Sequence, residues 1–247
     1  MLRRSVVLVR LGCLALALAL VSCGAEHTTL PGPSDIPLPL GSGDETRGGL
    51  LYDKWWNVNG GAKPTTTHPA YPAAGVRSGD TTWRCKECHG WDYQGVNGAY
   101  STGSHFTGIR GVLDASNQST QDLFAQISNA NHAFSQALSD EDINDLVAFV
   151  REGTIDMNQQ IEFATKRALG DPAVGKVLYD GSAQCASCHG ADGKLLFDLP
   201  DVARGNPWET LHKIRWGHPG SAMPSAVAAG FSLDQQVDIL AYCQALP

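Results

Sequence analysis

The chain contains the same five-residue pattern twice, and this repeat restricts its possible folds more than any other feature. The pattern is Cys-x-x-Cys-His, at Cys85-Lys86-Glu87-Cys88-His89 and again at Cys185-Ala186-Ser187-Cys188-His189. A random arrangement of the 7 cysteines and 8 histidines among 247 residues would give about 0.006 such matches. Two matches therefore indicate two copies of one functional site, and we expect each half of the chain to fold around one copy.

This pattern is the attachment signature of a c-type haem. Each thiol adds across one vinyl group of the porphyrin, and the histidine becomes an iron ligand. Zinc would normally need two close pairs of ligands, whereas 97 positions separate Cys88 from Cys185. A disulfide between the two cysteines of one pattern would leave its histidine unexplained. The sequence thus predicts two covalently bound haem c groups, attached through Cys85, Cys88, Cys185 and Cys188, with His89 and His189 as iron ligands.

Residues 1–22 have the features of an export signal. Arginines come first, and Leu11–Val21 forms an apolar run of 11 residues, about half the length that spans a bilayer. The end of the signal, Leu20-Val21-Ser22-Cys23, resembles the lipobox of bacterial lipoproteins. The resemblance implies that Cys23 is acylated and anchors the mature chain to a membrane. A retained signal anchor and a plain secreted protein are the alternatives.

The next stretch, residues 23–48, contains four prolines and many small polar residues and shows no apolar period. Such a composition is typical of a flexible tether. We expect it to hold the folded part away from the membrane.

Similar helix signals surround the two patterns. Asp171-Pro172 predicts the start of a helix and Gly181 its end, before the second pattern. Leu50, Leu51 and Tyr52 stand in the equivalent place before the first pattern. Towards the end of each half, Ser139 and Ser232 each open an amphipathic helix, with a capping Asp142 or Gln235 three residues later.

Helix, Cys-x-x-Cys-His, loop, second ligand and closing helix is the order of the small cytochrome c domain, which residues 49–247 therefore resemble. The resemblance implies an all-α fold of two cytochrome c-like domains in tandem, each around a covalent haem. The expected bounds are 49–155 for the first domain, 156–169 for a linker and 170–247 for the second domain.

In the cytochrome c domain the sixth iron ligand lies in the loop before the closing helix. In the second half this loop contains Met223-Pro224, a familiar form in this family, with His218 as a rival ligand. The first half has no methionine there, and His132 occupies the loop instead. We expect His132 and Met223 as ligands, so that the first haem is bis-histidine. For the first haem, His105, His68 or an open iron remain alternatives.

The first domain also carries an insert. Between Tyr52 and Cys85 lie 32 residues, against five between Tyr179 and Cys185. The insert is rich in aromatic residues, which either pack in the core or form a surface that covers the haem edge or contacts a partner.

A formal net charge of −7 and a pI near 5.5 make nucleic acid an improbable partner. Two haems in an exported, lipid-tethered, acidic chain favour electron transfer between redox protein partners, on the periplasmic or outer side of a membrane. The first hypothesis is therefore a membrane-anchored dihaem electron carrier. The alternatives are a haem subunit of a larger membrane oxidoreductase and a dihaem redox enzyme, for example one that oxidises sulfur oxyanions.

Overall fold

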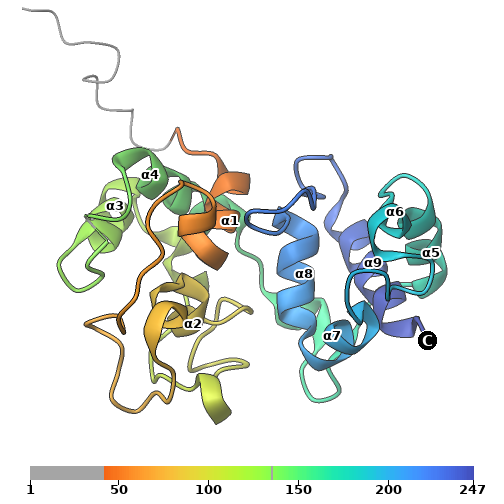
Figure 1. The fold of residues 1–247 in the computed structure, drawn as a ribbon, viewed down its shortest axis with the longest axis horizontal. Helices are drawn as coiled ribbons and strands as arrows, with labels where there is room; N and C mark the ends of the chain where they lie inside the picture. Colours follow the sequence, from red (N-terminus) through yellow and green to blue (C-terminus); the bar gives the residue numbers. More distant parts are fainter. Residues whose placement is uncertain (1–41, 135) are drawn as a thin grey trace, which may run out of the picture. The chain divides into compact units, whose positions relative to one another are not determined.

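The computed structural model describes residues 42–134 and 136–247, which belong to one compact unit (Figure 1). The predicted signal, Cys23 and most of the predicted tether lie outside the described residues. The α-helices of the described part are α1 (Glu45–Lys54), α2 (Cys85–His89), α3 (Thr120–Ser128), α4 (Asp140–Ala148), α5 (Pro172–Asp180), α6 (Cys185–His189), α7 (Leu199–Gly205), α8 (Pro207–Trp216) and α9 (Leu233–Ala245).

Short 3₁₀ segments join these helices at Trp55–Asn57, Gly79–Trp83, Gly103–His105, Leu113–Asn117 and Met157–Gln159, and a π-helical turn extends α4 over Phe149–Gly153. The strands β1 (Ile161–Glu162) and β2 (Arg167–Ala168) pair antiparallel. The all-α prediction is confirmed. No helix within residues 42–134 and 136–247 has both the length and the apolar character needed to span a bilayer.

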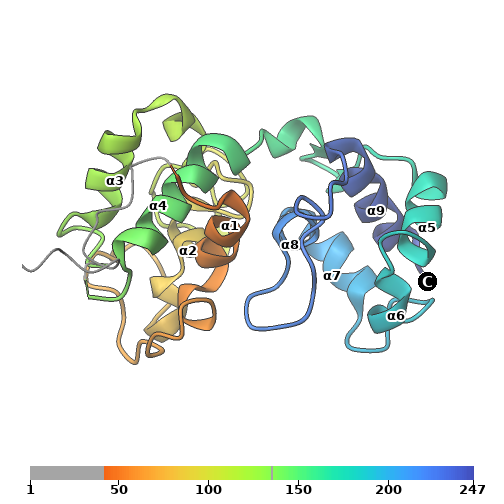
Figure 2. The ribbon, with the colours of Figure 1, turned by 90° about the horizontal axis from the view of Figure 1, so that it is seen from above.

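The first and last helices of each half lie side by side, α1 with α4 and α5 with α9 (Figures 1 and 2). The same hydrogen bond joins both pairs. The backbone N–H of Asp44 donates to the Asp145 carboxylate at 2.7 Å, and that of Asp171 donates to Asp238 at 2.7 Å. The side chains of Asp44 and Asp171 in turn cap the helices that follow them.

A glycine allows each of these helix pairs to approach closely. A Cβ at Gly48 would overlap the backbone carbonyl of Asp145, and one at Gly175 would overlap that of Asp238. One turn further on, a buried tyrosine reaches the Cys-x-x-Cys-His helix. The Tyr52 hydroxyl donates to the carbonyl of Gly90 at 2.6 Å, and Tyr179 donates to that of Gly190 at 2.9 Å. The two halves therefore repeat one set of contacts.

The predicted helix boundaries are confirmed at the closing helices. Ser139 and Ser232 form complete capping boxes with Asp142 and Gln235. The Asp171-Pro172 start and the Gly181 end of α5 are also as predicted.

Two segments differ from the expectations. Helix α1 begins at Glu45, inside the stretch expected to be tether, because Asp44 caps it and is itself bound to α4. The expected linker 156–169 holds a β-hairpin, whose paired residues Ile161 and Ala168 are both buried. Because the apolar side chains of this residue pair are buried, the connection is part of the core.

A buried polar contact joins the first half to α8. The carbonyl of Gly49 accepts from Nε2 of His212 at 3.0 Å, so Nδ1 of the same ring accepts from the Tyr93 hydroxyl at 2.8 Å. The indole N–H of Trp216 donates to the same hydroxyl at 3.3 Å. Burial lowers the pKa of His212 to about 3, which keeps the ring neutral. Both ring nitrogens are therefore committed to fixing α8 against the first half.

A buried ion pair lies beside this contact. The Asp53 carboxylate, 1% exposed, binds the guanidinium of Arg84 and, at 2.6 Å, the ammonium of Lys213 on α8. Burial alone would raise the pKa of Asp53, but Lys213 and Arg84 outweigh it and hold that pKa well below its usual range. The charged form of Asp53 thus contributes to the contact between the halves.

Replacement of this carboxylate tests its contribution. Asp53→Asn should lower the free energy of unfolding by about 3 kcal/mol, because two cations lose their counter-ion in a largely buried site. Since the folded pKa is lowered, the stabilisation is present above the unfolded pKa of about 3.9 and is lost as the pH falls below it. Urea unfolding at pH 7 and at pH 3 measures both effects. The difference between wild type and variant should shrink at pH 3, and an unchanged difference would contradict this assignment.

Candidate functional site

The first Cys-x-x-Cys-His pattern forms helix α2 and faces a cavity. Cys85, Cys88 and His89 line this cavity of about 170 Å³, together with His132 from the loop between α3 and α4. Both cysteines are free thiols. The remaining wall is mainly apolar and includes Val112, Ala115, Leu123, Ile127, Phe134, Leu146 and Val150. An apolar chamber with two thiols and the imidazoles of His68, His89 and His132 has the donor set that a covalent haem requires.

His89 is held in one tautomer. Its Nδ1 lies 2.7 Å from the carbonyl oxygen of Arg110, which can only accept, so Nδ1 carries the proton. Nε2 is then the unprotonated nitrogen that can bind a metal ion. Burial lowers the pKa of His89 to about 4, so the ring stays neutral at pH 7. Both conditions suit an iron ligand.

The His132 ring faces that of His89 at the separation that one metal ion between them requires. The two ring centroids lie 6.3 Å apart and the ring planes are 28° from parallel. Two imidazoles on opposite sides of one ion, with metal–nitrogen bonds of about 2 Å, place their centroids about 6 Å apart. Nδ1 of His132 is buried and has no hydrogen-bond partner among the described residues, and burial lowers the pKa of His132. The residues of this site therefore fit an iron porphyrin.

The two rival histidines of the first half are otherwise engaged. Nε2 of His68 donates to the carbonyl of His132 at 2.7 Å, and its Nδ1 accepts from the backbone N–H of Ala70. His105 bonds Glu87 through Nδ1 and Arg77 through Nε2. Neither ring offers a free nitrogen in this structure, in contrast to His132.

Charged residues lie buried in the spacer of the first pattern, which the sequence did not indicate. Glu87 is fully buried and binds Lys86 at 2.8 Å and His105 at 2.9 Å. Burial alone would raise the pKa of Glu87, but His105 and Lys86 outweigh it, and the pKa is lowered. The positive charge of Lys86 on α2 is thus neutralised by the Glu87 carboxylate inside the fold.

The second pattern forms helix α6. Cys185 is partly buried and Cys188 is exposed, both as free thiols. His189 is partly buried, and the ring of Phe197 meets it edge-on at 5.5 Å. Within the part of the chain that the structure describes, Nδ1 of His189 has no hydrogen-bond partner. Met223 lies partly buried in the loop between α8 and α9, the counterpart of the loop that carries His132. His218 contacts Lys213 at 2.9 Å through Nδ1.

Apolar side chains are exposed beside the second pattern. Leu195, Leu196 and Phe197 are 68%, 66% and 47% exposed, and the backbone of Leu195 bonds the carbonyl of His189. A flat apolar group attached to Cys185 and Cys188 would bury part of this surface. The residues of the second site are thus compatible with the same prosthetic group.

Among residues 42–134 and 136–247 no group of three or more His, Cys, Asp or Glu side chains is arranged to hold a metal ion. Each Cys-x-x-Cys-His pattern contributes two cysteines and one histidine to its own half of the chain.

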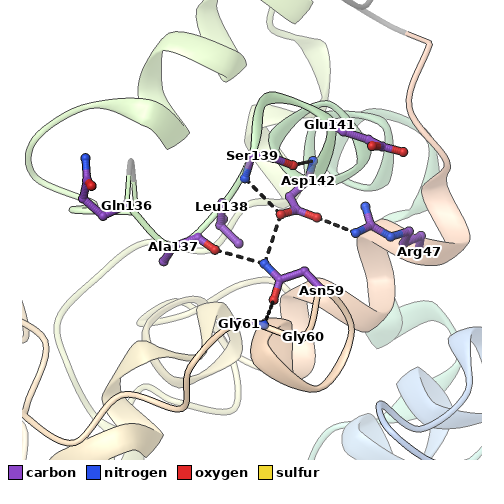
Figure 3. Close-up of a pocket in the computed structure, with 10 residues that line it drawn as sticks. All are labelled: Arg47, Asn59, Gly60, Gly61, Gln136, Ala137, Leu138, Ser139, Glu141 and Asp142. Atoms are coloured by element: carbon purple, nitrogen blue, oxygen red, sulfur yellow. Dashed lines mark hydrogen bonds and ion pairs between the residues drawn. The ribbon is translucent and has the colours of Figure 1, made fainter. Parts of the chain in front are cut away.

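A larger hollow of about 560 Å³ lies at the surface (Figure 3), and no residue of either pattern lines it. Its central polar groups bind one another. Asp142 accepts from Arg47 and, at 3.0 Å, from Asn59, whose amide also donates to the carbonyl of Ala137. These bonds fasten the start of α4, and the hollow has no part in the candidate sites.

The comparison with family models matches one segment of the first half. Residues 75–150 match the family model described as "Cytochrome C oxidase, cbb3-type, subunit III". No curated protein sequence matches the chain. A solved structure of the reducing HAO-like protein complex of Kuenenia stuttgartiensis aligns with 66% of this chain and 91% of that chain, at 18% identity and a TM-score of 0.27.

The matched segment contains the first pattern, His132 and all of α4. The match supports a similarity of this segment to cytochrome c domains, which bind haem covalently and transfer electrons. The second pattern lies outside the match.

The buried charge in the spacer can be tested directly. Glu87→Gln should lower the free energy of unfolding by about 3 kcal/mol, because Lys86 would remain buried without its counter-ion. Glu141→Gln, at an exposed position of α4, is the control and should change stability by less than about 0.5 kcal/mol. Equal effects of both substitutions, measured by urea unfolding, would contradict the assignment.

Proposed function

We propose that this protein is an exported, membrane-anchored dihaem c-type cytochrome that transfers electrons between redox partners. The observation that carries the proposal is the facing pair His89 and His132 across a cavity lined by Cys85 and Cys88. When bound, haem supplies one-electron oxidation and reduction. The chain holds it, sets its potential and excludes water from it.

In the first half, Cys85 and Cys88 would form the thioether bonds and His89 and His132 would ligate the iron. The hydrogen bond from His89 to the Arg110 carbonyl orients the ring and increases its basicity. The apolar wall keeps solvent away from the site. With His89 and His132 both as ligands, the iron would suit electron transfer and would have no free position for a substrate.

In the second half, Cys185, Cys188 and His189 would attach and ligate the second haem, with Met223 as its sixth ligand. The proposal is supported by the contacts that both halves share: the capping aspartates, the glycine at each helix crossing, and the tyrosine bonded to the glycine after each histidine. These repeated contacts also support two cytochrome c domains in tandem.

The two ligand sets would separate the reduction potentials. A thioether favours ferrous iron and raises the potential relative to a second imidazole. With His132 in the first site and Met223 in the second, electrons would run from the first haem to the second. The contact of His212 with Gly49 and Tyr93 would keep α8 fixed against the first half during this electron transfer.

The membrane anchor rests on the sequence alone. Acylation of Cys23 would hold the chain at a membrane surface, on the periplasmic side or the cell exterior. The acidic net charge would favour a partner with a basic docking surface.

A second candidate function is that of a haem subunit in a larger membrane oxidoreductase. The match of residues 75–150 to a family named for an oxidase subunit favours it specifically. The enzyme alternative is less well supported, because the geometry around His89 offers an endogenous sixth ligand.

Haem counting tests the proposal. Mass spectrometry of the intact protein should show the mass of the chain plus two haems. Replacing Cys85 and Cys88 by alanine should remove one of them, and replacing Cys185 and Cys188 should remove the other. A single haem in the wild type, lost with the first pair only, would contradict the dihaem assignment.

The His132 assignment can be tested by redox titration. His132→Met should raise the potential of one haem by on the order of 0.1 V, a fraction of the about 0.8 V that axial ligands span. The potential of the other haem should stay unchanged. The control is His105→Gln. The His105 ring contacts Glu87 and Arg77 and not the loop between α3 and α4 that carries His132 (the distal loop). A titration in which His132→Met shifts neither potential would exclude His132 as a ligand.

A further inference from the structure

The insert, residues 53–84, runs from α1 to the first Cys-x-x-Cys-His helix and also contacts the opposite side of the cavity. Its residue His68 is 8% exposed and lies against the loop that carries His132. This contact joins the attachment side of the candidate haem site to its distal side. The second half has no such insert, because only five residues lie between Tyr179 and Cys185.

Hydrogen bonds fix the tautomer of His68. The backbone N–H of Ala70 donates to Nδ1 at 3.1 Å, so Nδ1 is unprotonated and Nε2 carries the proton. Nε2–H donates to the carbonyl oxygen of His132 at 2.7 Å. The ring thus restrains the backbone of the residue whose side chain faces His89.

The insert holds His68 firmly. The backbone N–H of His68 donates to the Thr82 hydroxyl at 2.9 Å, and the Trp83 ring packs edge-on against the imidazole at a centroid distance of 4.4 Å. Trp83 is itself fixed, because its indole donates to Thr66 and its carbonyl accepts from Trp55. Thr82 and Trp83 directly precede Arg84 and Cys85, so the support for His68 is continuous with the haem-attachment helix.

On its other side His68 packs on the distal loop. Its ring lies 5.5 Å from that of Phe134, two residues after His132. His132 therefore receives two restraints from His68, a hydrogen bond to its own carbonyl and an aromatic contact to its neighbour. Ala133, between them, has a left-handed backbone (φ 53°), a strained conformation that such restraints help to maintain.

We infer that His68 is a positioning residue, which clamps the distal loop so that His132 stays on the iron of the first haem. The inference rests on the proposed function, because it assumes that His132 is the sixth ligand. It assigns to the insert the role of keeping this haem six-coordinate and closed to exogenous ligands. The dissociation of His132 would then be opposed by the Nε2–H bond of His68, an effect of about fivefold for one neutral hydrogen bond.

The test is the rate at which carbon monoxide binds the reduced full-length protein, because binding requires His132 to leave the iron. His68→Phe keeps an aromatic ring against Trp83 but removes the donor, and should speed binding about fivefold. His68→Gln keeps a donor within reach of the His132 carbonyl and should restore a rate near that of the wild type. Tyr71→Phe, which removes a hydroxyl bonded within the insert to Arg77, is the matched control and should have no effect.

His132→Ala identifies the phase that belongs to the first haem and separates the two hypotheses. If it accelerates no carbon monoxide phase, the ligand assignment itself is wrong. If it does, while His68→Phe behaves as the wild type, His132 is the ligand and the clamp is refuted. Equal acceleration by His68→Phe and His68→Gln would also refute the hydrogen bond as its basis. Loss of the bis-imidazole EPR signal in both His68 variants would make His68 the ligand and overturn the inference.

Discussion

The close crossing of the first and last helices is the contact on which each half of this structure depends. Gly48 and Gly175 permit it, because no side chain could stand between those backbones. The crossing places Tyr52 and Tyr179 where their hydroxyls reach the residue after each histidine of the Cys-x-x-Cys-His helices. Helix packing thereby helps to determine where the thiols and the imidazole are presented.

The two candidate sites differ in their surroundings although their scaffolds repeat. In the first, His89 is oriented by Arg110, His132 faces it, and the insert packs over the distal loop. In the second, Nδ1 of His189 has no hydrogen-bond partner in residues 42–134 and 136–247, and exposed leucines lie nearby. A site with two restrained imidazoles and a more exposed site with a thioether would favour opposite oxidation states, which suits transfer of an electron in one direction. The buried contacts of His212 and Asp53 keep α8 fixed to the first half.

The sequence predicted the scaffold well, because its signals are local. Capping residues at Ser139, Ser232 and Asp171 specify helix starts through bonds that span three residues, and all three are confirmed. The start of α1 was missed, because Asp44 stands among prolines and glycines and its decisive partner, Asp145, lies 101 positions away. The hairpin after α4 was missed because its strands have two residues each.

The details of the first site were less predictable because they depend on long-range contacts. Position in the loop before the closing helix favoured His132 over His68 and His105, and the structure adds which ring nitrogens are already bonded. The burial of Glu87 was also unexpected, because a charged residue between two cysteines would ordinarily face solvent. His105, Lys86 and Arg77 come from three places in the chain to surround it.

The central claim is that one chain holds two haems with different axial ligands, His89 with His132 and His189 with Met223. A low-temperature EPR spectrum of the oxidised protein tests it most directly. The account predicts two low-spin ferric signals of equal intensity, one typical of bis-imidazole and one of imidazole–thioether ligation. A high-spin or thiolate-type signal in place of the bis-imidazole signal, or one signal alone, would contradict it.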